Sequence, residues 1–353
     1  MKKKGIAVIG RVAKDVELLD GQTVKTRVLY EELCNRFPGH SVITVDTYRY
    51  GKRFPVILVN LIRAFLHSKH IFVLLSRNGR TYLFPVITGL NRLFRRHLYH
   101  DVIGGALPKE AAASPSLRKQ LGRFEVNWVE TVQMKEALQE VGVTNVEILH
   151  NFKRLPILIP NQLSLEREEP YIFTMFSRVV REKGMDHASK AVAEVNRRAG
   201  RTRALLRIYG PIDPSYEVEF IALLKQYEGV VTYEGCVPYK ESVEALSRSF
   251  VLLFPSTYPG EGMPGTILDA FAAGVPVIAT DWHFNGELVH NGITGYCYDW
   301  HNMEQLTEWV AYAVEHPEEI DQMRENCLQA AHLYSADAAM EQICRRMGED
   351  GEL

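Results

Sequence analysis

Residues 252–278 read LLFPSTYPGEGMPGTILDAFAAGVPVI, and this stretch decides the fold of the 353-residue chain. Its pattern predicts a short apolar strand ending at Phe254, a polar loop broken by Pro and Gly, a helix of about two to three turns, and a second apolar strand from Pro276. A strand, a helix and a strand in this order form a β-α-β step. Such steps build parallel sheets that carry helices on their faces.

Two acidic residues of this stretch are candidate ligand-binding groups. Glu261 lies in the predicted loop just before the helix, and Asp269 lies inside the helix. Loop carboxylates and free backbone N–H groups at a helix N-terminus, beside the carboxyl end of a strand, form sites for polar, phosphorylated ligands in open α/β sheets. Acidic pairs at this spacing also occur on solvated helices, so the pair alone is weak evidence for a ligand site. The surrounding Pro-Ser, Gly-Met-Pro and Gly-Val-Pro segments strengthen that interpretation.

A second loop brings two cations to the end of another predicted strand. Residues 171–176 are apolar and are followed by Arg178, by Lys183 with Gly184, and by a predicted helix over 188–198. Two cations at the carboxyl end of a strand can neutralise a diphosphate. The alternative is a solvated loop without a ligand, and the Glu261 stretch in the same chain favours the functional interpretation.

Both stretches resemble the signature of the retaining GT-B glycosyltransferases of glycosyltransferase family 4. The family pattern is Glu, seven residues and Glu, then a small-residue helix ending in Gly-x-Pro. Here it is matched by Glu261, seven residues, Asp269 and the Gly-Val-Pro of 274–276. The second acid is Asp where Glu is usual, which keeps the charge and shortens the reach. Arg178 and Lys183 match the family's Arg and Lys, which lie five residues apart ahead of a Gly.

The resemblance, together with the alternation of strand and helix segments through both halves, predicts an α/β fold of the GT-B type. We expect two doubly wound parallel-sheet, Rossmann-like domains that face a cleft. An acceptor-side domain is expected over 1–155, a nucleotide-sugar-binding domain over 156–335, and a C-terminal helix crossing back to the first domain over 336–353. The segment 151–170 holds three prolines and no amphipathic period, and it is predicted to link the domains.

The resemblance also implies a role for each site residue. Arg178 and Lys183 are expected to clamp the donor diphosphate, and Glu261 to hold sugar hydroxyls or orient the site. Asp269 is expected to take the ribose hydroxyls, while His100, at the end of a predicted strand, is expected to face the donor sugar from the first domain. The other donor-binding positions are glycines and their neighbours in the loops: Gly21, Gly210, Gly262, Met263, Pro264 and Gly265.

The loop at Gly21 departs from the family pattern. The family has a Gly-Gly loop near the donor phosphates, whereas this chain has Asp20 before Gly21. Lys25 or Arg27, in the helix predicted over 24–36, could reach an anion from this loop. A plain strand-to-helix turn is the alternative.

The activity that the resemblance implies is sugar transfer from a UDP- or GDP-sugar to a hydroxyl of a glycan, glycolipid or lipid-linked acceptor. The anomeric configuration is kept, and the expected setting is bacterial surface polysaccharide synthesis. The chain has no Asp-x-Asp metal motif, and we expect neither a metal nor a cofactor, and no nucleic acid partner. Two alternatives stay open: a GT-B epimerase or hydrolase of nucleotide sugars, and a two-domain sugar-nucleotide binding protein without turnover.

Charge divides the chain into two unlike halves, although the net charge is only -2. Residues 1–160 hold 25 Lys and Arg against 13 Asp and Glu, a balance of +12, whereas residues 161–353 hold 16 against 30, a balance of -14. The predicted helices over 54–66 and 82–98 place apolar residues beside basic ones, as at a lipid interface. An anionic membrane surface is therefore one expected partner of the first half. The alternatives are a phosphate-bearing acceptor, buried core helices, and attraction between the two domains.

The cysteines and the N-terminus bear on localisation. The five cysteines are scattered and include no Cys-x-x-Cys pair, which indicates reduced thiols and favours the cytoplasm. The apolar run after the basic N-terminus is too short for a signal sequence or a membrane span, and it is predicted to be the first strand. We expect a cytoplasmic protein, peripheral on the inner face of the membrane if the lipid interpretation holds.

Overall fold

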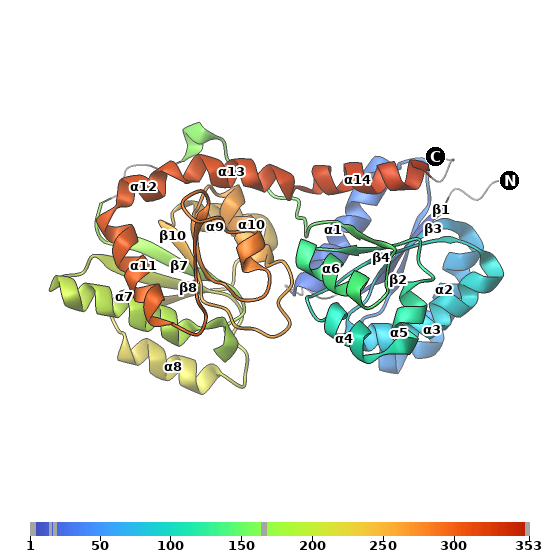
Figure 1. Cartoon of the computed structure of the whole chain (residues 1–353), viewed down its shortest axis with the longest axis horizontal. Coiled ribbons are helices and arrows are strands. Elements are labelled where there is room, and N and C mark those ends of the chain that lie inside the picture. The colour runs from blue at the N-terminus through green and yellow to red at the C-terminus, as the bar shows by residue number, and fades with distance from the viewer. Residues whose placement is uncertain (1–4, 14–15, 17–19, 164–167, 350–353) are drawn as a thin grey trace. The chain divides into compact units, whose positions relative to one another are not determined.

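The computed structural model describes residues 5–13, 16, 20–163 and 168–349 of the chain. These residues form two compact units, one made of Met1–Arg154 with Ala336–Leu353 and the other of Leu155–Ser335. Each unit holds one six-stranded sheet with helices packed against it (Figure 1). The strand pairs of both sheets are parallel. The predicted α/β fold with two doubly wound, Rossmann-like sheets is confirmed.

The sheet of the first unit has the strand order β2-β1-β3-β4-β5-β6. Its strands are β1 (Gly5–Gly10), β2 (Val42–Asp46), β3 (Ser68–Leu74), β4 (His97–Asp101), β5 (Val126–Val129) and β6 (Val146–Ile148). Its helices are α1 (Gly21–Arg36), α2 (Tyr50–His67), α3 (Arg77–Phe94), α4 (Leu107–Ala113), α5 (Pro115–Leu121), α6 (Val132–Glu140) and α14 (Ala336–Glu349). The strand order reverses between β1 and β3, so their carboxyl ends flank a switch point of the kind at which open α/β sheets bind ligands.

The last helix of the chain, α14, belongs to the first unit and packs against α1. Met340 and Ile343 of α14 are fully buried. Arg154 pairs with Glu32 of α1 at 2.5 Å and with Asp337 of α14 at 2.6 Å, which ties the two helices together. The end of the chain thus completes the core of a unit that is built mainly from its beginning.

The sheet of the second unit has the strand order β12-β11-β10-β7-β8-β9. Its strands are β7 (Tyr171–Phe176), β8 (Ala204–Tyr209), β9 (Val231–Gly235), β10 (Val251–Phe254), β11 (Val277–Thr280) and β12 (Gly295–Tyr298). Its helices are α7 (Met185–Ala199), α8 (Glu217–Gln226), α9 (Ser242–Ser247), α10 (Gly265–Ala272), α11 (Glu304–Glu315), α12 (Pro317–Gln322) and α13 (Arg324–Leu333). The order reverses between β7 and β10, which places this unit's switch point at their carboxyl ends.

Residues 252–278 have the structure that their pattern predicts. β10, α10 and β11 follow one another, and β10 pairs directly with β11 in parallel, with Leu252 opposite Val277. The helix ends at Ala272, and Gly274 then adopts a left-handed φ of 64°. A glycine in this conformation after the last turn is a common helix terminator because it has no Cβ to clash.

The prediction of one helix over 82–98 is wrong at its end. Helix α3 stops at Phe94, because Arg95 adopts a left-handed conformation and its backbone N–H donates to Asn91 O. The Asn91 side chain then pairs with the Arg96 backbone in both directions, and the strand β4 begins at His97. None of the described helices, α2 and α3 included, is both long and apolar enough to cross a membrane.

Candidate functional site

Two loops of the second unit bring the predicted charged residues to the switch point of its sheet. The loop after β7 carries Arg178 and, in a short 3-10 turn, Lys183. The loop after β10 carries Glu261 just before α10. Because β7 and β10 are hydrogen-bonded neighbours in a parallel sheet, both loops leave the same edge side by side.

Lys183 and Glu261 form a direct ion pair between these two loops. The Lys183 Nζ contacts Glu261 Oε2, and both side chains are largely buried. The Ser256 hydroxyl donates to the same carboxylate oxygen at 2.9 Å and is itself fully buried. The sequence assigns Lys183 to a phosphate and Glu261 to a sugar, whereas the structure makes them partners of one another.

Arg178 and Lys183 share one aromatic ring. The Arg178 guanidinium carbon lies 5.3 Å from the centroid of the Tyr258 ring, and the Lys183 ammonium lies 5.5 Å from it. The ring face carries partial negative charge, so it stabilises both cations without neutralising them. Arg178 is exposed and lines a cavity of about 330 Å³ together with Arg181, Asp213 and Tyr216. This cavity gives an anion access to Arg178, whereas Lys183 is buried and does not line it.

Gly184 lets the two loops approach each other. It has a left-handed φ of 75°, and a Cβ at this position would lie 2.6 Å from Pro255 O. The Thr257 backbone N–H donates to Glu182 O at 2.8 Å, which fixes the same approach from the other loop. The short distance between Lys183 and Glu261 therefore depends on a residue without a side chain.

Asp269 lies within α10, as predicted, but its carboxylate is below the surface. The residue is 1% exposed, and its Oδ1 accepts a hydrogen bond of 3.0 Å from the hydroxyl of Ser242, which begins α9. The short Asp side chain thus ends at a partner within the protein. Its role toward a ribose stays a prediction.

Four residues predicted to bind the donor precede and begin α10, and their donor-binding role stays a prediction. Gly262, Met263 and Pro264 are buried in the loop, and Gly265 begins the helix. The first N–H groups of a helix have no partner within it and carry partial positive charge. The Thr266 hydroxyl donates to Phe176 O, which ties this end of α10 to β7.

Gly210 is required by the chain itself. It follows β8 with a φ of 131°, and a Cβ on it would lie 2.0 Å from Ser177 O in the loop after β7. The close approach to Ser177 is therefore enough to explain a glycine at this position. Its predicted role in letting a nucleotide approach the backbone stays a prediction. Its direct effect is to hold the start of the Arg178 loop close to β8.

His100 does not have the position expected of a sugar-binding residue. It lies in β4, is fully buried, and packs edge-on against Phe84. Its Nδ1 lies 2.9 Å from Asn127 Oδ1, and because the Asn127 amide donates elsewhere, His100 Nδ1 carries the proton. Burial, with Arg80 nearby, lowers the pKa of His100 to about 3. The prediction that His100 faces a donor sugar is wrong in this structure, because a strand end can point into the core as well as out of it.

The loop at Gly21 likewise does not present its cations to an anion. Asp20 caps α1 by accepting from the Thr23 N–H, and Gly21 is the first residue of the helix. Arg27 donates to backbone carbonyls, Val12 O at 2.7 Å among them. Asp20 and Gly21 thus form the start of α1, whereas residues 14–15 and 17–19 before them lie outside the described residues, and the donor-binding role of Gly21 stays a prediction.

Lys25 is occupied by two buried carboxylates of the first unit. Its Nζ lies 2.7 Å from Asp101 and 3.0 Å from Glu130. Burial raises the pKa of Asp101 to about 6, although the Lys25 charge lowers it. Burial alone would lower the pKa of Lys25, but the two carboxylates outweigh it and raise that pKa. This cluster is an internal ion network at the carboxyl edge of the first sheet.

Three residues that surround the Lys183–Glu261 pair had no role predicted from the sequence. Ser256 and Tyr258 lie in the quoted stretch, and their nearness to a strand end was the available signal. His283 follows β11 with a left-handed φ of 51°, which is strained for a residue with a side chain. Burial lowers the pKa of His283, while the nearby Glu261 opposes this shift. Strain next to a charged pair marks the loop after β11 as a third wall of the site.

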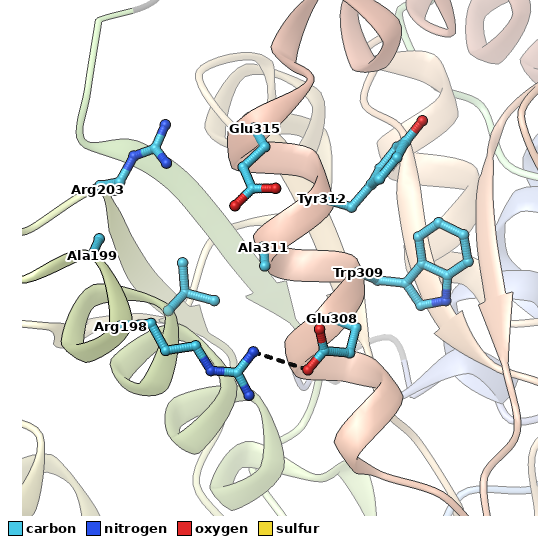
Figure 2. A pocket seen from close by; sticks show the side chains of 9 residues that line it. Arg198, Ala199, Arg203, Glu308, Trp309, Ala311, Tyr312 and Glu315 are labelled. Carbon is cyan, nitrogen blue, oxygen red and sulfur yellow. Dashed lines mark hydrogen bonds and ion pairs between the residues drawn. The ribbon is translucent and has the colours of Figure 1, made fainter.

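A larger cavity of the second unit lies away from these loops. It has a volume of about 510 Å³ and lies between α7 and α11. Figure 2 shows Arg198 and Glu308 directed toward each other across it, with Trp309 and Tyr312 farther along α11. Its α7 residues are at the C-terminal end of that helix, whereas Lys183 precedes the N-terminal end. The cavity therefore belongs to the opposite edge of the sheet.

The described residues offer no evident metal site. Within residues 5–13, 16, 20–163 and 168–349, no three His, Cys, Asp or Glu side chains gather in a group that could hold a metal ion.

Comparison with known proteins places this geometry in context. Residues 161–330 match the model of the family described as glycosyl transferases group 1. The chain is 26% identical over 168 residues to the alpha-D-kanosaminyltransferase of Streptomyces kanamyceticus, and 29% identical over 157 residues to the sucrose synthase of Melioribacter roseus. These alignments cover 47% and 40% of this chain, and 42% and 19% of the two relatives. The chain thus spans less than half the length of either relative.

Solved structures resemble almost the whole chain. HepE of Anabaena, in complex with UDP and glucose, superposes with a TM-score of 0.75 at 14% identity over 98% of this chain and 100% of its own. The sucrose-phosphate synthase of Thermosynechococcus elongatus gives a TM-score of 0.75 at 16% identity over 99% and 100%. At such low identity the likeness establishes the fold alone. The chain has the GT-B fold, and residues 161–330, within its second unit, match the glycosyl transferases group 1 model.

Proposed function

We propose that the protein transfers a sugar from a nucleotide-diphosphate sugar, UDP- or GDP-linked, to a hydroxyl of a glycan, glycolipid or lipid-linked acceptor. The observation that carries this proposal is the meeting of Arg178, Lys183 and Glu261 at the switch point of a glycosyltransferase group 1 domain. A structural neighbour in complex with UDP and glucose supports a nucleotide sugar as donor. We further propose that the transfer keeps the anomeric configuration of the sugar and that the protein belongs to glycosyltransferase family 4.

The proposed chemistry concentrates negative charge on the leaving diphosphate. The bond from the anomeric carbon to the diphosphate oxygen breaks, a bond to the acceptor oxygen forms, and the acceptor hydroxyl gives its proton to the leaving diphosphate oxygen. Arg178 and Lys183 stabilise the growing charge, together with the N-terminus of α10. The proposed reaction uses no metal ion and no cofactor, because the two cations and the helix dipole stabilise the charge on the diphosphate.

The ion pair suggests how the donor engages the site. In the described structure the Lys183 charge is balanced by Glu261, while Arg178 is exposed. An entering diphosphate supplies Lys183 with a second anion and weakens its hold on Glu261. The Glu261 carboxylate, still held by the Ser256 hydroxyl, can then accept hydrogen bonds from the sugar. In this scheme the Asp269 carboxylate accepts hydrogen bonds from the ribose hydroxyls as well as from Ser242.

The proposal extends to the setting of the reaction. We place the enzyme in bacterial surface polysaccharide synthesis, peripheral on the inner face of the membrane. The excess of Lys and Arg over residues 1–160 supports this setting, because it favours contact with anionic lipid or with a phosphate-bearing acceptor.

Replacement of the buried cation tests the proposal. Lys183→Ala should lower kcat/KM for transfer by at least about a hundredfold, because it removes one of two charges facing the leaving group. Since this change also leaves Glu261 without its partner, Arg178→Ala at an exposed position serves as a second variant with little cost to folding. Lys190→Ala, on the exposed side of α7, is the matched control and should keep full activity.

The assay also separates the rival functions. Release of UDP or GDP is measured from a panel of nucleotide sugars, with and without acceptor, alongside sugar incorporation. Release without incorporation under every acceptor condition points to a hydrolase, and donor binding without release points to a binding protein. Ordinary transfer by both Lys183→Ala and Arg178→Ala would remove the diphosphate clamp.

A further inference from the structure

Helix α2 turns an apolar surface toward the solvent. Its side chains Ile57, Leu61, Ala64 and Phe65 are buried against the first unit. The opposite side is apolar as well, with Val59 at 64% exposure and Val56 at 59%. We call the exposed side the α2 stripe, and its members are Phe54, Val56, Val59, Ile62 and Leu66. An apolar surface of this kind on the solvent side of a helix is normally covered, so the α2 stripe calls for a partner.

The spacing of these residues makes one continuous face. Val59, Ile62 and Leu66 follow one another by three and four positions, which aligns them along one side of the helix. Helix α3 lies beside α2 (Figure 1). The Phe65 and Phe94 rings make one contact between them, with centroids 5.8 Å apart. Helix α3 adds further exposed apolar side chains, Leu93 the most exposed of them. Among the described residues, seven of the fourteen exposed large apolar side chains lie on α2 and α3.

The charge around the α2 stripe is of one sign. From Thr47 to His100 the chain has ten Lys and Arg and not one Asp or Glu. Arg63 lies on α2 beside the stripe, and Arg92 lies near the end of α3; both are exposed. Most of the positive balance of the first half, +12 over residues 1–160, therefore comes from the segment that forms these two helices.

We propose that the α2 stripe and its flanking arginines are a docking surface for a bilayer that contains anionic lipid. The apolar side chains enter the boundary between headgroups and acyl chains, and the arginines meet lipid phosphates. This inference names the surface for the membrane setting in the proposed function. Its test measures binding alone, so its failure leaves the transfer proposal standing.

Other occupants fit the surface less well. A second copy docked face to face would oppose arginine with arginine, and the segment from Thr47 to His100 offers no acidic side chain to relieve the repulsion. Nucleic acid would engage the arginines, but it presents phosphates rather than an apolar layer to the aliphatic stripe. A bilayer surface alone supplies both kinds of contact.

Vesicle sedimentation of the full chain tests the inference. Phosphatidylcholine vesicles with about a third phosphatidylglycerol should pellet the protein at about 0.05 M salt and release most of it at about 0.5 M, whereas pure phosphatidylcholine should bind it weakly. The variant Val59→Gln/Ile62→Gln/Leu66→Gln should lower the partition coefficient at least about tenfold. Arg63→Gln should lower it about fivefold at low salt.

A matched control excludes a general effect of surface polarity. Val218→Gln/Ile221→Gln changes two exposed apolar residues of α8 in the second unit, and it should bind vesicles like the parent. Circular dichroism melting checks that each variant is folded. The inference is overturned if the parent does not pellet with anionic vesicles, if the control loses as much binding as the stripe variant, or if the stripe variant instead converts a dimer into a monomer.

Discussion

His100 packs in the interior of the first unit, although the sequence led us to expect a sugar-binding role for it. Its ring lies between Phe84 and Phe124, and its Nδ1–H donates to Asn127 Oδ1. Its Nε2 is buried and has no hydrogen-bond partner among the described residues. A proton added there would be a buried, unpaired charge, so the ring stays neutral throughout the ordinary pH range.

This burial predicts a pH effect on stability. Because the pKa of His100 is about 3 in the folded protein and ordinary in the unfolded chain, only the unfolded chain takes up this proton between about pH 6.5 and pH 3. The His100 contribution is therefore complete above about pH 6.5 and is lost as the pH falls, by up to about 1.4 kcal/mol per pH unit. His100→Gln should lose less stability than the parent between pH 7 and pH 5 when melting is compared at both. Equal losses would contradict the assignment. The Asp101 carboxyl titrates in both proteins and cancels in the comparison.

At the scale of elements, two loops make the candidate site because their strands are neighbours. β7 and β10 are far apart in the sequence and pair in the sheet, which brings Lys183 to Glu261. The two loops are held by the Thr257 N–H bond to Glu182 O and by the close approach at Gly184. The site is therefore a property of the sheet order as much as of its residues.

Replacing Gly184 should separate the loops. In Gly184→Ala the new Cβ meets Pro255 O in a left-handed conformation, so both strain and a clash act on the Lys183 loop. Gly200→Ala, at the end of α7, has a similar φ of 67° but nothing within 4 Å, so it suffers the strain alone. We expect about 1 kcal/mol of destabilisation for Gly200→Ala, a larger loss for Gly184→Ala, and weakened donor binding only for Gly184→Ala. Thermal melting and donor titration measure the two effects. Equal donor affinity in both variants would show that loop closure does not matter.

At the scale of the whole molecule, the first unit is closed by the last helix of the chain. Ile343 and Met340 of α14 are fully buried in that unit, and Arg154 joins α14 to α1. Stability of the first unit thus depends on residues that follow the entire second unit in sequence.

Truncating one buried side chain of α14 measures this dependence. Ile343→Ala should cost about 2–5 kcal/mol, because a buried methylene-rich side chain leaves a cavity behind. The melting temperature should fall by several degrees. Arg345→Ala, at an exposed position on the same helix, should change it little. A null result for Ile343→Ala would mean that α14 contributes little to the core of the unit.

The candidate site could be predicted in part from the sequence. Arg178, Lys183 and Glu261 were recognisable because they match a glycosyltransferase signature in loops that follow apolar runs. Their mutual pairing was not, because it requires knowing that β7 and β10 are adjacent. His100 had the same local signal as these residues, a polar side chain at a strand end, and the sequence does not show which way a strand end points.

The alternation of strands and helices that builds two parallel sheets could be predicted from the sequence alone, whereas helices such as α4, α5 and α8 were not predicted. Apolar runs, helical spacing and Gly or Pro breaks are local properties, so they can be recognised without knowing any long-range contact. Only the tertiary structure decided that Lys183 pairs with Glu261, that Ser242 holds Asp269, that His100 and Lys25 are internal, and that one apolar side of α2 faces solvent. Each of these depends on which segments become neighbours in space, and side-chain burial and charge pairing follow from those neighbours.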